Sequence, residues 1–150
     1  MRGAVEENIE MCICDSAHSR HFVLRKDAPI DYLPWGLHYW ACNPGLVETR
    51  NLLVVQVDMP PKTAHAFHLH PQREEVLWII EGQAEQWIDR EKMVLGPGDS
   101  AFIPPDTVHG IYNDSQQVTR FLAILSPAET NGPMLIDVQH EEPWRSLRVA

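Results

Sequence analysis

The stretch AHAFHLHPQREEVLWIIEG, residues 64–82, decides the fold class together with GPGDSAFIPPDTVHGIYN, residues 96–113. The first segment carries His68 and His70, with Glu75 five positions later, and the second carries a third histidine, His109. Because successive side chains of a β-strand alternate between its faces, His68 and His70 point the same way. Two imidazoles side by side on one face of a strand suggest a metal chelate.

The residue types in this set are ligands of first-row transition metals. A neutral imidazole offers a nitrogen lone pair and a carboxylate offers an anionic oxygen, and Fe, Mn, Co, Ni, Cu and Zn accept both. Glu74 and Glu75 are adjacent, so only one of them can share the face of the histidines. His109 shares a face with Ile111 and Asn113, and it reaches the other two histidines only if two strands are neighbours in a sheet or barrel.

The first segment resembles the first motif of the cupin superfamily, G-x5-H-x-H-x(3,4)-E-x6-G. The chain has His68-x-His70-x4-Glu75-x6-Gly82, with Lys62 at the position of the opening glycine. Only the second of the two adjacent glutamates has the motif's spacing to Gly82. The resemblance therefore selects Glu75 as the carboxylate ligand.

The second segment resembles the second cupin motif, G-x5-P-x-G-x2-H-x3-N. The chain has Gly98-x5-Pro104-x-Asp106-x2-His109-x3-Asn113. Asp106 replaces a glycine of the motif, which is a mild departure because Asp accepts turn geometry better than most residues. All four metal-ligand positions of the two motifs are kept.

What this resemblance implies is an all-β cupin fold, a jelly-roll or double-stranded β-helix barrel. It implies one divalent transition metal ion, Fe, Mn, Ni, Cu, Co or Zn, held by His68, His70, Glu75 and His109. Cupins commonly pair through exchanged edge strands, so a homodimer is also expected. The two motifs cover about a third of the chain, and the double match is far more specific than either half.

The rest of the sequence agrees with a β-barrel. Short apolar segments recur from residue 51 onward, separated by Gly, Pro, Asn or Asp, which is typical of an all-β barrel or sandwich. The expected strands are 52–57, 66–70, 75–80, 84–88, 92–95, 100–103, 108–112 and 118–125, with 134–138 as a further edge strand. We divide the chain into an N-terminal arm packing on the barrel (1–48), a single cupin barrel (49–140) and a C-terminal tail (141–150).

Aromatic residues are concentrated in the arm and occur again in the tail. Tyr32, Trp35, Tyr39 and Trp40 lie within residues 30–40. They suit a lid over the barrel mouth, a subunit interface or ordinary packing of the arm. Trp144 in the tail packs either on the barrel or against another subunit.

Composition restricts the class of partner. The 150 residues suffice for one domain with a sizeable core. Lys and Arg number 12 against 21 Asp and Glu, a formal net charge of −9 without a basic cluster. Such a surface repels nucleic acid and anionic membranes. We expect a small-molecule substrate or ligand, with no nucleic-acid or membrane partner.

The sequence predicts a soluble cytoplasmic protein. No apolar run approaches the roughly 20 residues that cross a bilayer, and the N-terminal residues lack a secretory apolar core. The cysteines, Cys12, Cys14 and Cys42, are odd in number, which fits a reducing compartment. Cys12 and Cys14 with His18 and His21 have a spacing that fits no common zinc knuckle, so we expect no second metal site there.

Two functional hypotheses remain open. An open coordination position distinguishes a catalytic metal from a structural one, and it would support a dioxygenase, an isomerase or a lyase acting on a small organic molecule. The alternative is a non-catalytic small-molecule binding or sensing module. Fold analogy does not choose between them, because one fold hosts many chemistries.

An acid or base that faces the metal would separate the two hypotheses, but residue parity alone assigns no catalytic residue. His65 lies three positions before His68 and is expected to face away from it on an unbroken strand, at the rim or surface. The candidates for this role are Tyr39, Gln56, His65, Tyr112 and Arg120.

Overall fold

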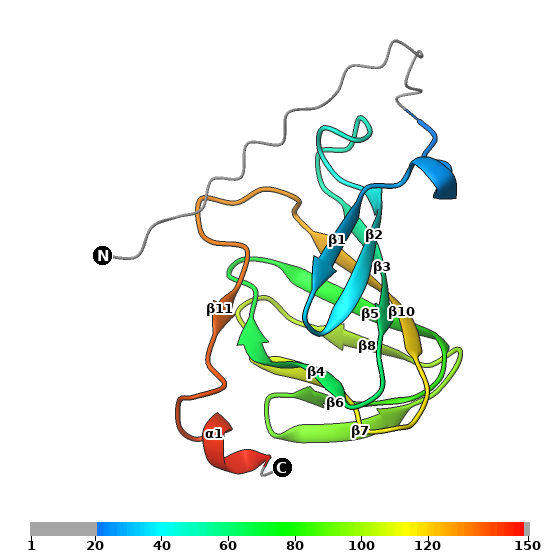
Figure 1. Cartoon of the computed structure of the whole chain (residues 1–150). Helices are drawn as coiled ribbons and strands as arrows, with labels where there is room; N and C mark the ends of the chain where they lie inside the picture. The colour runs from blue at the N-terminus through cyan, green and yellow to red at the C-terminus, as the bar shows by residue number, and fades with distance from the viewer. Residues whose placement is uncertain (1–20, 149–150) are drawn as a thin grey trace.

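The computed structural model describes residues 21–148, which form two antiparallel sheets (Figure 1). The six-stranded sheet has the order β1 (Ile30–Leu33), β2 (Gly36–Cys42), β3 (Leu53–Met59), β10 (Thr119–Ser126), β5 (Glu74–Glu81) and β8 (Ser100–Ile103). The five-stranded sheet has the order β11 (Ile136–Asp137), β4 (Thr63–Leu69), β9 (His109–Asn113), β6 (Ala84–Ile88) and β7 (Glu91–Leu95). This arrangement confirms the predicted all-β cupin fold.

The main core lies between the two sheets. Strands β3 and β10 alternate between buried and partly buried residues along their whole length, as a period of two requires. Ile79 of β5, Ile103 of β8 and Ile111 of β9 complete this core from neighbouring strands. Phe121, Ala123 and Leu125 are buried within it.

Residues 30–42, within the segment that we divided off as the N-terminal arm, form a β-hairpin. Strands β1 and β2 pair with each other, and β2 pairs with β3, with Tyr39 opposite Gln56. The hairpin therefore extends the six-stranded sheet, and Trp35 in its turn packs on the main core. A 3-10 turn at Arg25–Asp27 precedes it.

The chain has another residue at two positions where the cupin motifs have glycine, and the backbone is left-handed at both. Lys62 has φ 59° and Asp106 has φ 58°. The Lys62 amide donates to the carbonyl of Asn113, with N and O 2.8 Å apart. The Asp106 carboxylate accepts a hydrogen bond from the Gln72 amide at 3.0 Å. These turns need the conformation that glycine adopts most easily, and the chain builds them without glycine.

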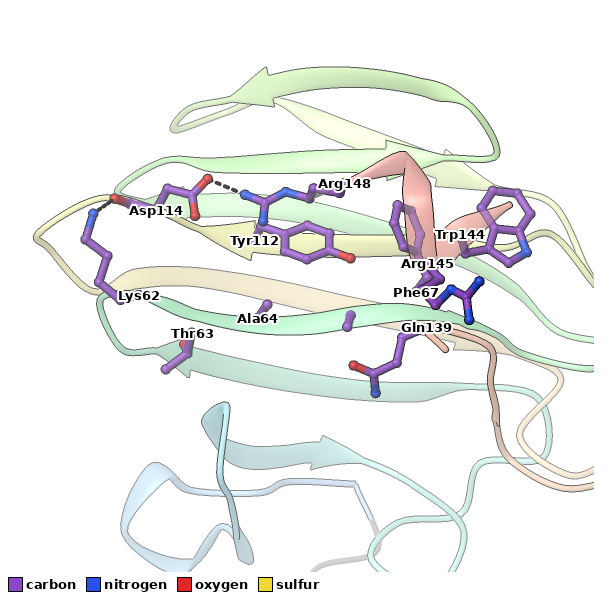
Figure 2. A pocket seen from close by; sticks show the side chains of 11 residues that line it. Lys62, Thr63, Ala64, Phe67, Tyr112, Asp114, Gln139, Trp144, Arg145 and Arg148 are labelled. Carbon is purple, nitrogen blue, oxygen red and sulfur yellow. Dashed lines mark hydrogen bonds and ion pairs between the residues drawn. The ribbon is translucent and has the colours of Figure 1, made fainter. Parts of the chain in front are cut away.

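The C-terminal segment packs back on the outer face of the five-stranded sheet. Trp144 of the short helix α1 (Trp144–Leu147) lies 5.5 Å from the ring of Phe67, and the Arg148 guanidinium lies 3.9 Å above the ring of Tyr112 (Figure 2). Phe67, Tyr112 and Trp144 belong to a second, smaller apolar cluster with Trp87 and Val138. Within residues 21–148 the helical segments are short, and none has the length and hydropathy of a transmembrane span.

Candidate metal centre

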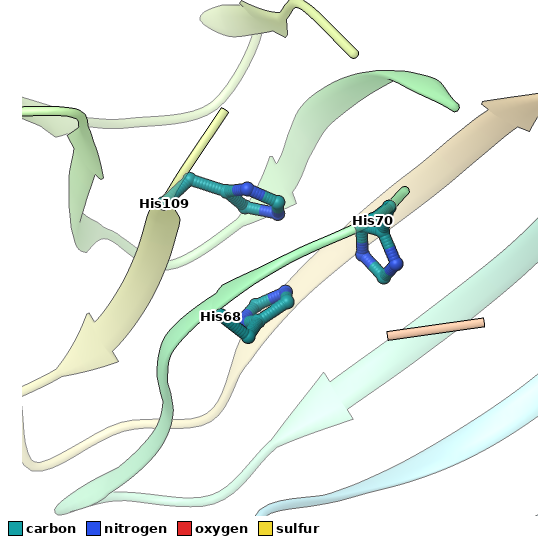
Figure 3. Close-up of side chains that lie close together, drawn as sticks. All are labelled: His68, His70 and His109. Carbon is teal, nitrogen blue, oxygen red and sulfur yellow. The ribbon is translucent and has the colours of Figure 1, made fainter. Parts of the chain in front are cut away.

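Three histidines gather inside the barrel: His68 of β4, His109 of β9, and His70, which directly follows β4 (Figure 3). His68 of β4 pairs directly with His109 of β9, and their ring centroids are 4.2 Å apart. His70 follows β4, 5.0 Å from His68 and 5.2 Å from His109 between ring centroids. One ring nitrogen from each lies within 4.8 Å of the others, and all three residues are buried.

Backbone carbonyls fix the orientation of each ring. The Nδ1 atoms of His68, His70 and His109 lie 2.7, 2.7 and 2.9 Å from carbonyl oxygens. Because a carbonyl only accepts, each Nδ1 carries the proton and each Nε2 keeps a free lone pair. Carbonyl partners of this kind orient histidine ligands in metal sites. The carbonyls belong to Ala66, Met134 and Thr107, respectively.

Glu75 reaches the same space from β5 in the opposite sheet. It is buried, whereas Glu74 is exposed, so alternation separates the two carboxylates as expected. Its Oε2 lies 2.9 Å from His109 Nε2 and 3.4 Å from His70 Nε2. The short contact is not aligned as a hydrogen bond, and both Glu75 Oε2 and His109 Nε2 are buried without a hydrogen-bond partner among residues 21–148. These orphaned atoms fit a cation, which would satisfy both.

The electrostatics of the cluster favour forms of the side chains that bind metal. Burial and the neighbouring imidazoles hold the pKa of His68 well below its ordinary value, and burial also lowers the pKa of His70. Burial alone would raise the pKa of Glu75, but His109 and His70 lower it below the usual range. Burial opposes protonation of His109, but the Glu75 carboxylate raises its pKa. The site thus combines neutral imidazoles at His68 and His70 with the ionised Glu75 carboxylate.

The expectation that His65 faces away from His68 is wrong. Along β4, His65 pairs with Ile111 and His68 pairs with His109, so three steps on β4 match two on β9. This β-bulge adds one residue and turns both histidines toward the barrel interior. Their rings stack with centroids 3.6 Å apart and an interplanar angle of 19°. Burial lowers the pKa of His65 to about 3, so its imidazole is neutral.

The other four acid or base candidates do not face the cluster. Tyr112 belongs to the outer aromatic cluster, where it lies 5.7 Å from the ring of Phe67. Tyr39, Gln56 and Arg120 share the outer face of the six-stranded sheet. Among its contacts there, the Arg120 guanidinium donates to Asp58 at 2.8 Å.

Two buried residues near the site were missed from the sequence. His38 of β2 is buried, and its ring lies 4.4 Å from that of Trp35. Arg73 is 5% exposed and donates to three carbonyls of the 127–133 loop, at 3.1 to 3.3 Å. That loop leads to Met134, whose carbonyl orients His70. An arginine that follows Pro71 and Gln72 is typical of an exposed turn, so no local signal in the sequence indicated that Arg73 is buried.

The second cysteine and histidine group lies almost wholly outside the described residues. Cys12, Cys14 and His18 precede residue 21, so the structure does not test the expectation made for them.

Comparison with known proteins agrees with this geometry. Residues 55–125, from β3 to β10, match the cupin domain family. Over 75 residues the chain is 32% identical to quercetin 2,3-dioxygenase of Bacillus subtilis, a match that covers 50% of this chain and 22% of that protein. The chain spans 54%, 22%, 57% and 54% of the lengths of four curated relatives.

Solved structures share the fold over more of the chain. An oxalate decarboxylase of Lactobacillus farciminis, in complex with formate, aligns with a TM-score of 0.66 and 17% identity over 77% of this chain and 35% of that chain. The polyketide cyclase RemF of Streptomyces resistomycificus aligns with a TM-score of 0.65 and 20% identity over 82% of this chain and 89% of that chain. Identities this low show the fold alone. The family match shows a cupin domain at residues 55–125 of this chain, and the solved structures show the shared fold.

Proposed function

We propose that this cupin is a metal-dependent enzyme that acts on a small organic molecule. Its metal ligands are His68, His70, Glu75 and His109, which hold a single divalent transition metal ion. The observation that carries the proposal is the set of three Nδ1-to-carbonyl bonds, which leaves three Nε2 lone pairs within one small buried space. The unpartnered Glu75 Oε2 beside them supports the same assignment.

The protein's own residues would prepare this site for catalysis. When bound, the metal supplies Lewis-acid or redox chemistry at a coordination position that four protein ligands leave open. Glu75 contributes the anionic ligand, and the apolar core around Ile79 and Ile111 limits access of water. Among the reaction classes, we favour a dioxygenase type because a relative with 32% identity over 75 residues is a quercetin 2,3-dioxygenase. An isomerase or lyase reaction would use the same ligands.

A specific observation favours the alternative of a non-catalytic binding or sensing module. Four of the five candidate acids and bases, namely Tyr39, Gln56, Tyr112 and Arg120, point away from the cluster. A binding module needs no such group beside its metal.

Elemental analysis tests the ligand assignment. Untagged, freshly purified protein should contain about one equivalent of Fe, Mn, Ni, Cu, Co or Zn, and His68→Ala or His109→Ala should remove it while the barrel stays folded. The control is Glu74→Gln, which alters the exposed neighbour of Glu75 and should keep the metal. Stoichiometric metal in both histidine variants would overturn the assignment. Oxygen uptake by the loaded protein with candidate substrates then separates dioxygenase chemistry from the other classes.

We also propose that the protein forms a homodimer through the outer face of the six-stranded sheet. Trp78, Ile80 and Phe102 lie on β5 and β8 with 48%, 41% and 56% of their surfaces exposed. Adjacent apolar side chains of this size are typical of association surfaces. Light scattering should give twice the mass of the chain, and Trp78→Lys should reduce it toward the monomer; an unchanged monomeric mass in both proteins would refute this proposal.

A further inference from the structure

A small cavity lies between β4, β11 and the turn of the β1–β2 hairpin, directly beside the metal cluster. Its volume is about 230 Å³, and we name it the side cavity. One of the metal-cluster histidines, His68, forms part of its wall. A molecule in the side cavity would therefore lie against the proposed metal centre. Its other polar and larger lining residues are Trp35, His65, Leu135, Asp137 and Gln139.

Three stacked rings form one wall of the side cavity. Trp35 stacks on His65 with centroids 4.1 Å apart and an interplanar angle of 11°, and His65 stacks on His68. This column fixes the plane of His65 from both sides. The two ring nitrogens of His65 lie on the edge of the imidazole, and the stacking fixes the position of this edge beside the cavity.

His65 differs in hydrogen bonding from the other histidines of the barrel interior. His38, His68, His70 and His109 each place Nδ1 against a backbone carbonyl. Neither ring nitrogen of His65 makes a hydrogen bond to any residue within 21–148, although the ring is stacked on both faces. A neutral imidazole has one donor and one acceptor. Both remain available to a molecule in the side cavity.

The charge of the lining restricts what that molecule can be. Among residues 21–148, no Lys or Arg lines the side cavity, and Asp137 is its one formally charged side chain. The Asp137 carboxylate accepts hydrogen bonds from the Gln139 amide and side chain at 2.9 and 2.7 Å, which keeps it ionised near the wall. A dianion would meet this carboxylate without a compensating cation from the protein. An organic cation would instead lie close to the metal ion.

We propose that the side cavity is the substrate subsite of the metal centre and that His65 is its hydrogen-bonding contact. The substrate class that this geometry fits is an uncharged molecule bearing hydroxyl groups. One hydroxyl donates to, or accepts from, the His65 edge while the molecule lies against His68. This inference rests on the proposed function, because it needs the metal centre to be real.

The experiment uses zinc-loaded protein and two probes, catechol and oxalate. Both can bind a metal through two adjacent oxygens, but catechol is uncharged with hydroxyl donors and oxalate is a dianion at pH 7. Calorimetry should show that His65→Leu weakens catechol binding by about tenfold or more, because a buried hydrogen bond is lost. Oxalate binding should change less than about threefold, and His65→Gln, which keeps a donor and an acceptor, should restore most of the catechol affinity.

A measurement on the wild-type protein avoids dependence on a variant that folds poorly. Catechol should shift the ring nitrogen resonances of His65 in long-range proton–nitrogen NMR spectra, and those of His38 should not move. Absence of a His65 shift, absence of catechol binding, or equal losses of catechol and oxalate affinity in His65→Leu would each overturn the inference. Failure of the wild-type protein to retain zinc would instead refute the proposed function, so the two failures are distinguishable.

Discussion

The inner faces of two strand pairs differ: one pair is regular, and the other has a bulge and carries histidines of the candidate metal centre. In the pair β3 and β10, seven successive residues pair in unbroken register, and the inward residues other than Thr119 are apolar. In the pair β4 and β9, the register shifts between His65 and His68, and the inward residues include three histidines. The regular pair stabilises the fold, whereas the bulged pair accepts an irregularity in order to aim polar side chains inward.

The largest expected effect is a loss of stability without a loss of metal, caused by a substitution in the regular pair β3 and β10. Phe121→Ala in the regular pair should lower the free energy of unfolding by about 3–5 kcal/mol, because Phe121 is 2% exposed and its removal leaves a cavity. The protein that remains folded should still bind one metal ion. Denaturant unfolding together with metal analysis of the folded fraction checks both statements. Loss of metal from folded Phe121→Ala protein would show that the two strand pairs are not separable in this way.

The same contrast explains what the sequence could predict. Residues 84–88 and 100–103 were predicted with the observed strand bounds, and the other predicted barrel strands differ at one end or both. Alternation and turn residues are local signals, so they locate regular strands. They also placed Glu75 inside and Glu74 outside. The sequence-based prediction of the fold was therefore most accurate where the strand was regular.

The site was less predictable because part of it depends on register and on distant contacts. Nothing in AHAFHLH shows that one residue is extra, so the inward turn of His65 follows only from its pairing with β9. The carbonyl that orients His70 belongs to Met134, 64 positions later. Arg73, which donates to the loop before Met134, reads locally as an exposed turn residue. Such contacts arise when the chain closes into a barrel, and residue spacing does not encode them.

A second prediction concerns acid, to which the polar side of the barrel should be sensitive. Burial lowers the pKa of His38 below its ordinary 6.5, so the unfolded chain takes up this proton first as the pH falls. The contribution of His38 to stability is therefore complete above pH 6.5 and is lost as the pH falls toward its folded pKa. His65, with a pKa lowered to about 3, acts in the same direction over the range from 6.5 to 3.

Metal-free protein unfolded by denaturant at pH 7 and pH 5 provides the measurement. His38→Gln removes the titrating group, so its loss of stability between these pH values should be smaller than that of the wild type, by at most about 2 kcal/mol. The raised pKa of His109 gives a stabilising contribution that is complete below pH 6.5 and is lost as the pH rises above it, and the lowered pKa of Glu75 acts only below about 4.5. Both proteins contain these two groups, so neither affects the difference between them. Parallel pH dependences would contradict a buried, neutral His38.

The smallest expected effect concerns the two turns that flank the bulged pair, at Lys62 before β4 and Asp106 before β9. Lys62→Gly should stabilise the fold by up to about 1 kcal/mol, because glycine adopts the left-handed conformation without the steric cost that Lys pays there. Asp106→Gly relieves the same strain but removes the carboxylate that accepts the Gln72 amide, so the two effects should nearly cancel. Thermal and denaturant unfolding of both variants measures the difference. Equal stabilisation by the two substitutions would show that the Asp106 hydrogen bond contributes nothing, and the departure of this chain from the glycine of the second motif would then lack an energetic reason.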